Sequence, residues 1–237
     1  MDPILFDEVP KSRRNKQIQL LKNYIRGLNG LVAYYPLDEP SGSTAFNRAP
    51  TTLGTFDFTT TGASVNQSGQ LGRAYSFDGI NDELTRGLVT NRTSSTSTVI
   101  VMKSDDYTQN RQGIWSHGIS TQGYALILSG NATTDGSLMV LHHGIAWHDT
   151  NYNLADNNWH IIVFTLTAAA VGTIYIDGTQ IWTATTPPLS LGTPQTTSFI
   201  GSDDTGFFKG KLQHFAIINN TLSSDQALRL AQLAGLA

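Results

Sequence analysis

The chain has 237 residues and a net charge of −3, and only 14% of its residues are charged. Cysteine is absent, which excludes disulfides and thiolate zinc sites, and no apolar run reaches the roughly 18 residues of a membrane-spanning helix. This composition, rich in Thr, Ser, Asn and Gly, is more typical of a polar-surfaced β-sandwich than of a helical enzyme.

Charge is distributed unevenly along the chain. Residues 1–29 carry six basic and three acidic side chains, a net charge of +3, which leaves −6 for residues 30–237. We therefore expect two parts, an N-terminal arm over residues 1–29 and one domain over residues 30–237. The first residues lack the basic stretch and apolar core of a secretory signal peptide, so export by that route is not expected.

The arm contains the pattern of one amphipathic helix. Ser12 can cap it, apolar residues follow at spacings of three and four, and Gly27 and Gly30 mark its end. The apolar stripe must be buried, either against the chain's own domain or against partner subunits of a homo-oligomer. In the second case the helix is an assembly arm, whose residues are Arg13, Arg14, Ile18, Leu21, Ile25 and Leu28. Neither aromatic residues nor glycines interleave the basic cluster, so nucleic-acid binding is not expected.

The rest of the chain has the pattern of short strands bounded by Gly, Pro, Asn and Asp clusters. A first strand follows residue 30, with Val32, Tyr34 and Leu37 expected to face the core, and a second lies within residues 71–82. Further strands are expected at Thr98–Lys103, Gly113–Ser116, Tyr124–Leu128, Ser137–His142, Ser198–Gly201 and Phe207–Ile218.

The clearest pattern spans residues 157–182. Trp159 to Leu166 is a largely apolar, β-branched and aromatic run, which is typical of a strand buried on both faces. The next run ends at Asp177-Gly178, the preferred two-residue hairpin turn. Three antiparallel strands are therefore expected here.

A short helix is expected near the C-terminus. Ser223 and Gln226 are spaced as in a capping box, which satisfies free amides at the start of a helix. Leu228, Ala231 and Leu233 then repeat along its buried side.

Four segments, in this order, resemble the laminin-G-like and concanavalin-A-like lectin/glucanase jelly rolls of the bacterial and phage type. They are Leu37-Asp38-Glu39 with its Ser-Gly turn, Ala74-x-x-Phe77-Asp78-Gly79-x-x-Asp82, the meander from Trp159-His160 to Tyr175-Ile176-Asp177-Gly178, and the last aliphatic-aromatic strand before the C-terminal helix. The resemblance implies an all-β fold, an antiparallel jelly-roll β-sandwich of the concanavalin-A-like kind, to which the patterns above add an N-terminal helical arm and a short C-terminal helix. The chain departs from its relatives where the loop Phe46–Pro50 lacks an acidic residue and where Gln213-His214 replaces an Asp-Glu pair.

The number and spacing of the glutamates indicate whether the chain could be a glucanase. Retaining glucanases of this fold place two glutamates around an aspartate on one strand, because the carboxyls act as nucleophile and acid about 5–5.5 Å apart. No Glu-x-Asp-x-Glu occurs, and the only glutamates are Glu8, Glu39 and Glu83. The Gly-x-Ser-x-Gly motif, which carries the nucleophile of Ser/His/Asp hydrolases, does not occur either. The chain is therefore expected not to be an enzyme, and a hydrolase of unrecognised type remains an alternative.

Calcium is a possible cofactor, because relatives often hold it at a sheet edge through carboxylate, amide and backbone oxygens. The candidate ligands are Asp38, Glu39, Asp78, Asn81 and Asp82, with Glu83 beside them. Both departures from the relatives remove negative charge from such a site, and Asp38 and Asp78 could instead accept hydrogen bonds from turn amides. A zinc site built from His142, His143 and His148 would require the chain to fold back at Gly144, so ordinary loop histidines are preferred.

Two further segments are candidates for contacts with other molecules. A long connection between two strands combines aromatic and polar side chains of the kind that bind glycans; its candidate residues are Trp147, His148, Asp149, Asn151 and Tyr152. Trp115 and Trp182 are instead expected to be buried in the sandwich. The turn between the central strands has an apolar tip, Ala168, Ala169 and Ala170, which suggests a contact with another protein.

Taken together, the basic arm, the absence of cysteine and of a signal peptide, and the Thr/Gly-rich body favour a non-enzymatic display or decoration protein of a bacteriophage virion, on capsid or tail. Its lectin-like domain would adhere to surface glycans, and its arm would bind other virion proteins and further copies of the chain. A free, lectin-like carbohydrate-binding module is the alternative.

Overall fold

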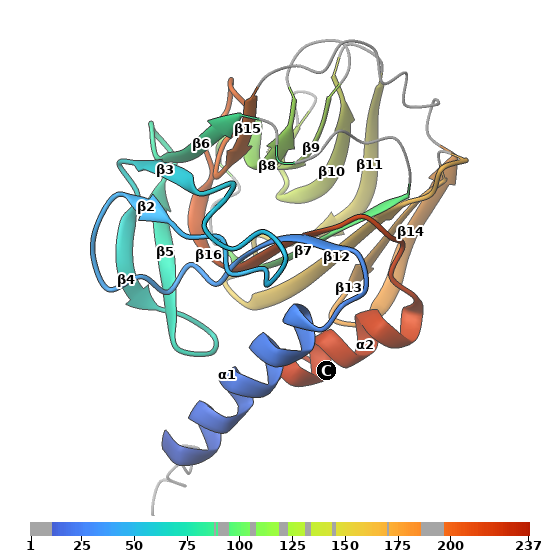
Figure 1. Ribbon diagram of the computed structural model, residues 1–237. Coiled ribbons are helices and arrows are strands. Elements are labelled where there is room, and N and C mark those ends of the chain that lie inside the picture. The colour runs from blue at the N-terminus through green and yellow to red at the C-terminus, as the bar shows by residue number, and fades with distance from the viewer. Residues whose placement is uncertain are drawn as a thin grey trace, which may run out of the picture.

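The computed structural model describes residues 11–87, 89, 95–104, 108–118, 123–130, 134–143, 146–169, 171–185 and 197–237. Two antiparallel sheets stack face to face, and two helices, α1 (Lys11–Arg26) and α2 (Ser224–Ala234), lie at one side of the sandwich (Figure 1). Neither of the helices found in these ranges is long and apolar enough to cross a membrane.

Each sheet contains eight of the described strands. Sheet A has the order β14-β13-β12-β7-β16-β5-β4, and β1 also pairs with β16. Its strands are β1 (Leu31–Tyr35), β4 (Ser64–Ser68), β5 (Arg73–Asp78), β7 (Thr96–Lys103), β12 (Trp159–Leu166), β13 (Val171–Ile176), β14 (Thr179–Thr185) and β16 (Lys209–Ile218). Sheet B has the order β11-β10-β9-β8-β15-β6-β3-β2. Its strands are β2 (Thr44–Ala45), β3 (Phe58–Thr61), β6 (Glu83–Gly87), β8 (Gln112–His117), β9 (Tyr124–Leu128), β10 (Ser137–His142), β11 (Ala146–Asn153) and β15 (Thr197–Ile200). The predicted β-sandwich with a helix at each end of the chain is confirmed.

The main core lies between the two sheets. Ile162 and Phe164 of β12 face it, and Trp115 of β8 is fully buried in it. Ile161 and Val163 of β12 point the other way, into a second apolar cluster on the outer face of sheet A. Because both faces of this strand are buried, its apolar run is nearly uninterrupted.

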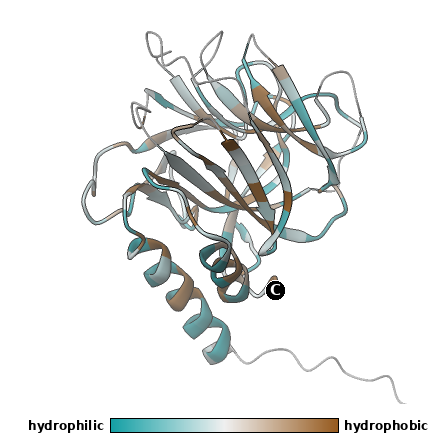
Figure 2. Ribbon diagram, turned by 90° about the vertical axis from the view of Figure 1, so that its right-hand side faces the viewer, coloured by the Kyte–Doolittle hydropathy of each residue, from teal (hydrophilic) through white to brown (hydrophobic). Residues whose placement is uncertain are grey.

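The two helices cover the outer face of sheet A. Leu21 and Ile25 of α1 are fully buried in the second cluster together with Leu230 of α2, and Figure 2 shows the helices side by side beneath the strands. Leu28 is buried in the same cluster and Ile18 packs against it. The apolar stripe of the predicted assembly arm therefore packs on the chain's own domain, and its binding to partner subunits stays a prediction.

The arm's two arginines lie outside this cluster. Arg13 is exposed, and the Arg14 guanidinium donates hydrogen bonds to the carbonyl oxygens of Gly69 and Gln70, at 3.2 and 3.0 Å. Arg14 thus ties α1 to the turn between β4 and β5.

Local signals fix the ends of α2 and of the central hairpin. Ser223 Oγ accepts a hydrogen bond from the Gln226 amide while Gln226 Oε1 accepts one from the Ser223 amide, which confirms the capping box. Asp177 and Gly178 both have positive φ, 51° and 83°, as a two-residue type I′ turn requires. The predicted hairpin is therefore confirmed.

Some local predictions were wrong. Ser12 lies inside α1 rather than before it. Tyr34 faces the cluster under the helices while Tyr35 faces the main core, because the pairing of β1 with β16 is irregular between Leu31 and Ala33. In α2, Leu228 is 42% exposed, and the buried position belongs to Leu230.

Candidate functional site

The predicted glycan-binding residues lie on an edge strand, β11, and not in a connection between strands as expected. Among the described strands β11 lies at the end of sheet B, next to β10 (Figure 1). Trp147 stands opposite Leu141 of β10 and Asp149 stands opposite Met139. His148 stands opposite Val140, a residue of the main core. Since neighbours along a strand point to opposite faces, Trp147 and Asp149 project from the outer face of sheet B.

Trp147 is half-buried on this outer face. Its ring packs against a small apolar cluster of Ala125, Ile127 and Leu141 from the neighbouring strands. A Cβ atom added at Gly130 would come within 2.3 Å of the ring, so the indole also lies directly over this glycine. Backbone and apolar side chains thus fix the orientation of the ring.

A guanidinium group lies over the same ring. Arg111 Cζ is 5.5 Å from the centre of the Trp147 ring, and Arg111 Nε donates a hydrogen bond of 2.9 Å to Asp203. The Asp203 side chain is fully buried and also accepts hydrogen bonds from the amides of Thr205 and Gly206. Arg111 is therefore held in place by a buried carboxylate and contributes a cation–π contact to the site.

The exposed end of β11 carries polar groups and one accessible aromatic ring. Asp149 Oδ1 accepts a hydrogen bond of 2.7 Å from the Asn151 amide, and Asn151 has a φ of 55° where the pairing with β10 shifts register. Thr150 Oγ1 donates to the carbonyl of Leu138 at 2.7 Å, which anchors the segment to β10. Tyr152 is 38% exposed. The segment thus presents a carboxylate, an amide and a phenol ring on a fixed backbone.

His148 does not join this group. Its ring faces the sandwich interior, 5.9 Å from the ring centres of both His142 and Trp182. Trp115 is fully buried as predicted, and Trp182 is partly buried against the main core. In the described ranges, no three His, Cys, Asp or Glu side chains are grouped to hold a metal ion.

The predicted calcium ligands are engaged separately. Asp38 forms an ion pair with Lys22, and Glu39 is buried and accepts hydrogen bonds from the Tyr75 hydroxyl and the Phe46 amide. Asp78 accepts hydrogen bonds from the amides of Ile80 and Asn81, as expected for a turn aspartate. The structure does not bring this ligand set together as one site.

Asp82 closes the same turn. Its Oδ2 accepts a hydrogen bond of 2.9 Å from the Asp78 amide, and burial raises the pKa of its carboxyl. Both aspartates of this turn therefore accept hydrogen bonds from backbone amides. Asn81 is exposed beside them.

His160 of β12 is buried. Its Nδ1 lies 2.7 Å from Asp177 Oδ2 and its Nε2 lies 3.0 Å from Asp156 Oδ1. Burial lowers the pKa of His160, but the hydrogen bonds and charges of the two aspartates outweigh it and raise this pKa overall. Both ring nitrogens are engaged, so the residue fastens β12 to the hairpin turn.

The apolar tip follows β12. Ala168 and Ala169 are exposed, and the Ala168 amide donates a hydrogen bond of 3.0 Å to Ser95 Oγ. Ala170 lies outside the described residues. A protein contact at this tip stays a prediction.

Arg111 and Asp203 were missed by sequence reasoning. One precedes β8 and the other follows β15, and 92 positions separate them. Only the pairing of these two strands brings them to the end of sheet B beside Trp147, so no local pattern could have identified them.

Comparison with known proteins agrees with this fold. Residues 77–227 match the family described as the concanavalin A-like lectin/glucanases superfamily, laminin G type. No curated protein matches the sequence. Domain 4 of AbnA, an extracellular arabinanase from Geobacillus stearothermophilus solved in complex with arabinotriose, is similar with a TM-score of 0.63 and 18% identity, over 85% of this chain and 98% of that domain.

Two larger proteins contain a similar domain. Trypanosoma rangeli sialidase, solved in complex with sialic acid, has a TM-score of 0.66 and 13% identity over 92% of this chain. Botulinum neurotoxin type C, which interacts with two ganglioside molecules, has a TM-score of 0.67 and 10% identity over 90% of this chain. The match spans only 38% of the sialidase chain and 53% of the toxin chain. At these identities the likeness shows the fold, and together with the family match it establishes that the chain belongs to the concanavalin A-like lectin/glucanase superfamily.

Proposed function

We propose that the chain is a non-enzymatic carbohydrate-binding domain that holds an oligosaccharide along β11 at the edge of sheet B. The observation that carries the proposal is the row of Trp147, Asp149, Asn151 and Tyr152 on one edge strand, with the Arg111 guanidinium fixed over the Trp147 ring.

The chemistry of these groups suits a sugar. The exposed Tyr152 ring can stack on the apolar face of a pyranose or furanose, and its hydroxyl can bind a sugar hydroxyl. The Asp149 carboxylate accepts hydrogen bonds and the Asn151 amide both donates and accepts them. Trp147 and Arg111, which are held by their neighbours, would form the base on which the sugar lies, and a rigid base reduces the entropy lost on binding.

The arabinanase domain supports this proposal, because its structure contains arabinotriose and this chain covers nearly the whole of that domain. The absence of enzymatic activity is part of the proposal. Glu39 is buried in hydrogen bonds to Tyr75 and Phe46, which leaves it unsuited to act as a nucleophile or an acid. Glycosidases need two carboxyls that face the same sugar.

A display role on a bacteriophage particle stays a prediction. None of the three proteins compared above is described as a virion component. The docking of Leu21 and Ile25 on the chain's own sheet also removes the free apolar stripe on which the assembly arm was expected to depend.

A glycan array tests the proposal, with the wild-type chain, Tyr152→Ala, Asp149→Asn and the control Leu228→Ala. Leu228 is as exposed as Tyr152 but lies on α2, against the other sheet. We expect the wild type and the control to bind the same glycans, and each β11 variant to bind them about tenfold more weakly or worse. A blank array for the wild type, or equal binding by all four proteins, would contradict the proposal.

A further inference from the structure

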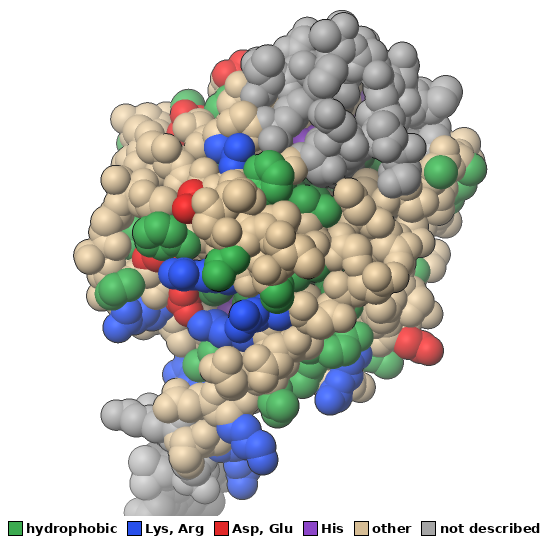
Figure 3. Space-filling view, viewed as in Figure 1, with side chains coloured by type: hydrophobic (Ala, Val, Ile, Leu, Met, Phe, Trp, Pro, Cys, Tyr) green, Lys and Arg blue, Asp and Glu red, His purple; other side chains and the backbone are tan. Residues whose placement is uncertain are grey.

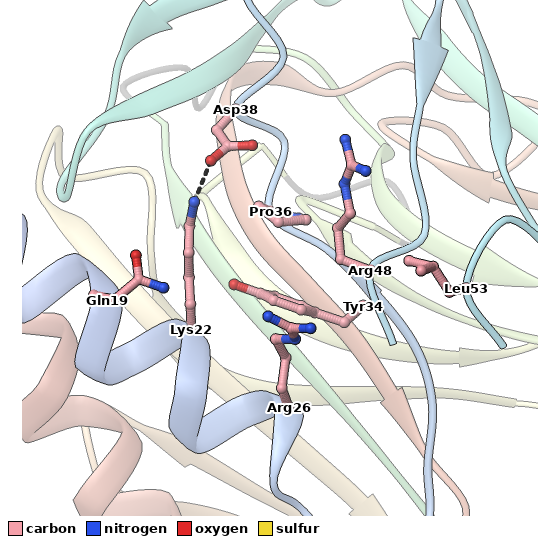
Figure 4. Close-up of a pocket in the computed structure, with 8 residues that line it drawn as sticks. All are labelled: Gln19, Lys22, Arg26, Tyr34, Pro36, Asp38, Arg48 and Leu53. Atoms are coloured by element: carbon pink, nitrogen blue, oxygen red, sulfur yellow. Dashed lines mark hydrogen bonds and ion pairs between the residues drawn. The ribbon is translucent and has the colours of Figure 1, made fainter. Parts of the chain in front are cut away.

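A separate pocket lies where α1 passes the end of β1 and the loop after β2. Its volume is about 320 Å³, and the side chains that decide its chemistry are Gln19, Lys22, Arg26, Tyr34, Asp38 and Arg48 (Figure 4). Figure 3 shows basic side chains gathered around a hollow on this face. None of these residues belongs to β11, so the pocket is distinct from the proposed carbohydrate site.

The pocket carries more positive charge than the protein itself neutralises. Asp38 pairs with Lys22, and these side chains are only 31% and 23% exposed. Arg26 and Arg48 form no ion pair with any carboxylate in the described part of the chain. Two guanidinium groups therefore remain available to a ligand.

The two arginines reach the pocket from different segments. Arg26 ends α1, and Arg48 belongs to the loop that follows β2 (Figure 4). Arg48 Cζ lies 5.0 Å from the centre of the Phe46 ring, a cation–π contact that restricts the guanidinium. The loop itself is fixed by Asn47, whose side chain accepts hydrogen bonds from the amides of Tyr34 and Ala49.

Tyr34 is one of the residues that line the pocket. The residue is buried, and its hydroxyl lies 2.8 Å from His214 Nδ1. Burial, and then the charge of Lys22, lowers the pKa of His214 to about 3, so this histidine is neutral near pH 7. When Nδ1 carries the proton of the neutral ring, the Tyr34 hydroxyl accepts from it.

We propose that this pocket binds a small organic anion of about monosaccharide size, whose phosphate or carboxylate charge is balanced by the guanidinium groups of Arg26 and Arg48. Guanidinium groups present paired donors that match the oxygens of either group, and they remain charged at any physiological pH. The pocket volume lies at the lower end of the range for small-molecule sites, which fits one sugar-sized body beside the anionic group. Gln19 would bind the neutral part of the ligand.

Titration calorimetry with four probes tests this inference: glucose 6-phosphate, glucuronate, inorganic phosphate and glucose. We expect at least one of the two anionic sugars to bind and glucose not to bind. Comparing the two anionic sugars distinguishes a phosphate ligand from a carboxylate ligand, and inorganic phosphate measures what the anionic group contributes alone. Arg26→Gln and Arg48→Gln should each weaken binding about tenfold, whereas Arg13→Gln, at an exposed position on the same helix, should leave it unchanged.

The inference is overturned if neither anionic sugar binds at concentrations up to about 10 mM. It is equally overturned if the Arg26→Gln, Arg48→Gln double variant binds them as the wild type does. Thermal unfolding of each variant checks that the fold is kept, which is expected because both arginines are exposed. Tyr152→Ala should not affect these titrations, so a failure here is distinguishable from a failure of the carbohydrate proposal.

Discussion

Tyr34 and His214 are 180 positions apart in the sequence, and the Tyr34 hydroxyl lies 2.8 Å from His214 Nδ1 in the interior of the protein. The two rings are stacked, with centres 6.1 Å apart and planes inclined by 17°. His214 has a φ of 53°, and its amide donates to the carbonyl of Pro36. The pair therefore fastens an irregularity of β16 to the strand β1.

His214 should make the protein sensitive to acid. The pKa of this buried histidine is about 3, below its ordinary value of 6.5, so between these values the unfolded chain takes up a proton that the native state does not. The stability due to neutral His214 is present above pH 6.5 and is lost as the pH falls toward 3, by about 1.4 kcal/mol per pH unit. Urea unfolding of the wild type and of His214→Asn between pH 7 and pH 4 measures this, because asparagine tolerates positive φ. Equal pH slopes for the two proteins would refute the assignment.

Removing the hydroxyl tests the same pair at neutral pH. Tyr34→Phe should lower the free energy of unfolding by about 1–3 kcal/mol, since a buried histidine nitrogen is left without a partner. Tyr152→Phe removes a hydroxyl from an exposed ring and should change stability by less than about 0.5 kcal/mol. Similar effects of the two substitutions would show that the hydrogen bond does not stabilise the fold.

His160 should have the opposite dependence on pH. Its pKa is raised, because the hydrogen bonds and charges of Asp177 and Asp156 outweigh the effect of burial. The stability that it contributes is therefore fully present below its unfolded pKa of about 6.5 and is lost as the pH rises through the folded pKa. We expect His160→Gln to lower the melting temperature more at pH 5.5 than at pH 8.5. A melting difference that does not change with pH would contradict this assignment.

The docking of α1 can be tested with two adjacent leucines. Leu21 is fully buried and Leu20 is 47% exposed. Leu21→Ala should reduce the free energy of unfolding by about 2–5 kcal/mol, whereas Leu20→Ala should change it by less than about 0.5 kcal/mol. Equal, small effects at both positions in the isolated chain would mean that α1 does not dock on its own domain.

The best predicted parts of the fold were those specified by local sequence. Strand β12 was foreseen with its bounds because both of its faces are buried, so nearly every residue of the run is apolar. The turn at Asp177-Gly178 and the cap at Ser223 depend on residue types that few other conformations favour. β11 was mistaken for a connection because it is an edge strand with polar side chains on its exposed end.

The sites depend on contacts between distant segments, which is why sequence reasoning found only part of them. The pocket combines Lys22 and Arg26 of the arm with Arg48 of the domain, and only the docking of α1 brings them together. The Gln213-His214 pair was interpreted as a loss of negative charge. Gln213 instead accepts a hydrogen bond from the Leu71 amide and donates one to the Leu71 carbonyl. A glutamine at this position therefore satisfies buried backbone groups.

The indole N–H signals of the four tryptophans test glycan binding along β11 most directly. The ¹⁵N-labelled protein is titrated with the glycan that binds most tightly on the array, and Trp147→Phe identifies the signal of Trp147. We expect the Trp147 signal to shift as glycan is added, until the site is saturated. The signals of Trp115, which is fully buried, and of Trp159, which packs near the helices, should not shift. A glycan that shifts the Trp159 signal and leaves that of Trp147 unchanged would contradict a binding site on β11.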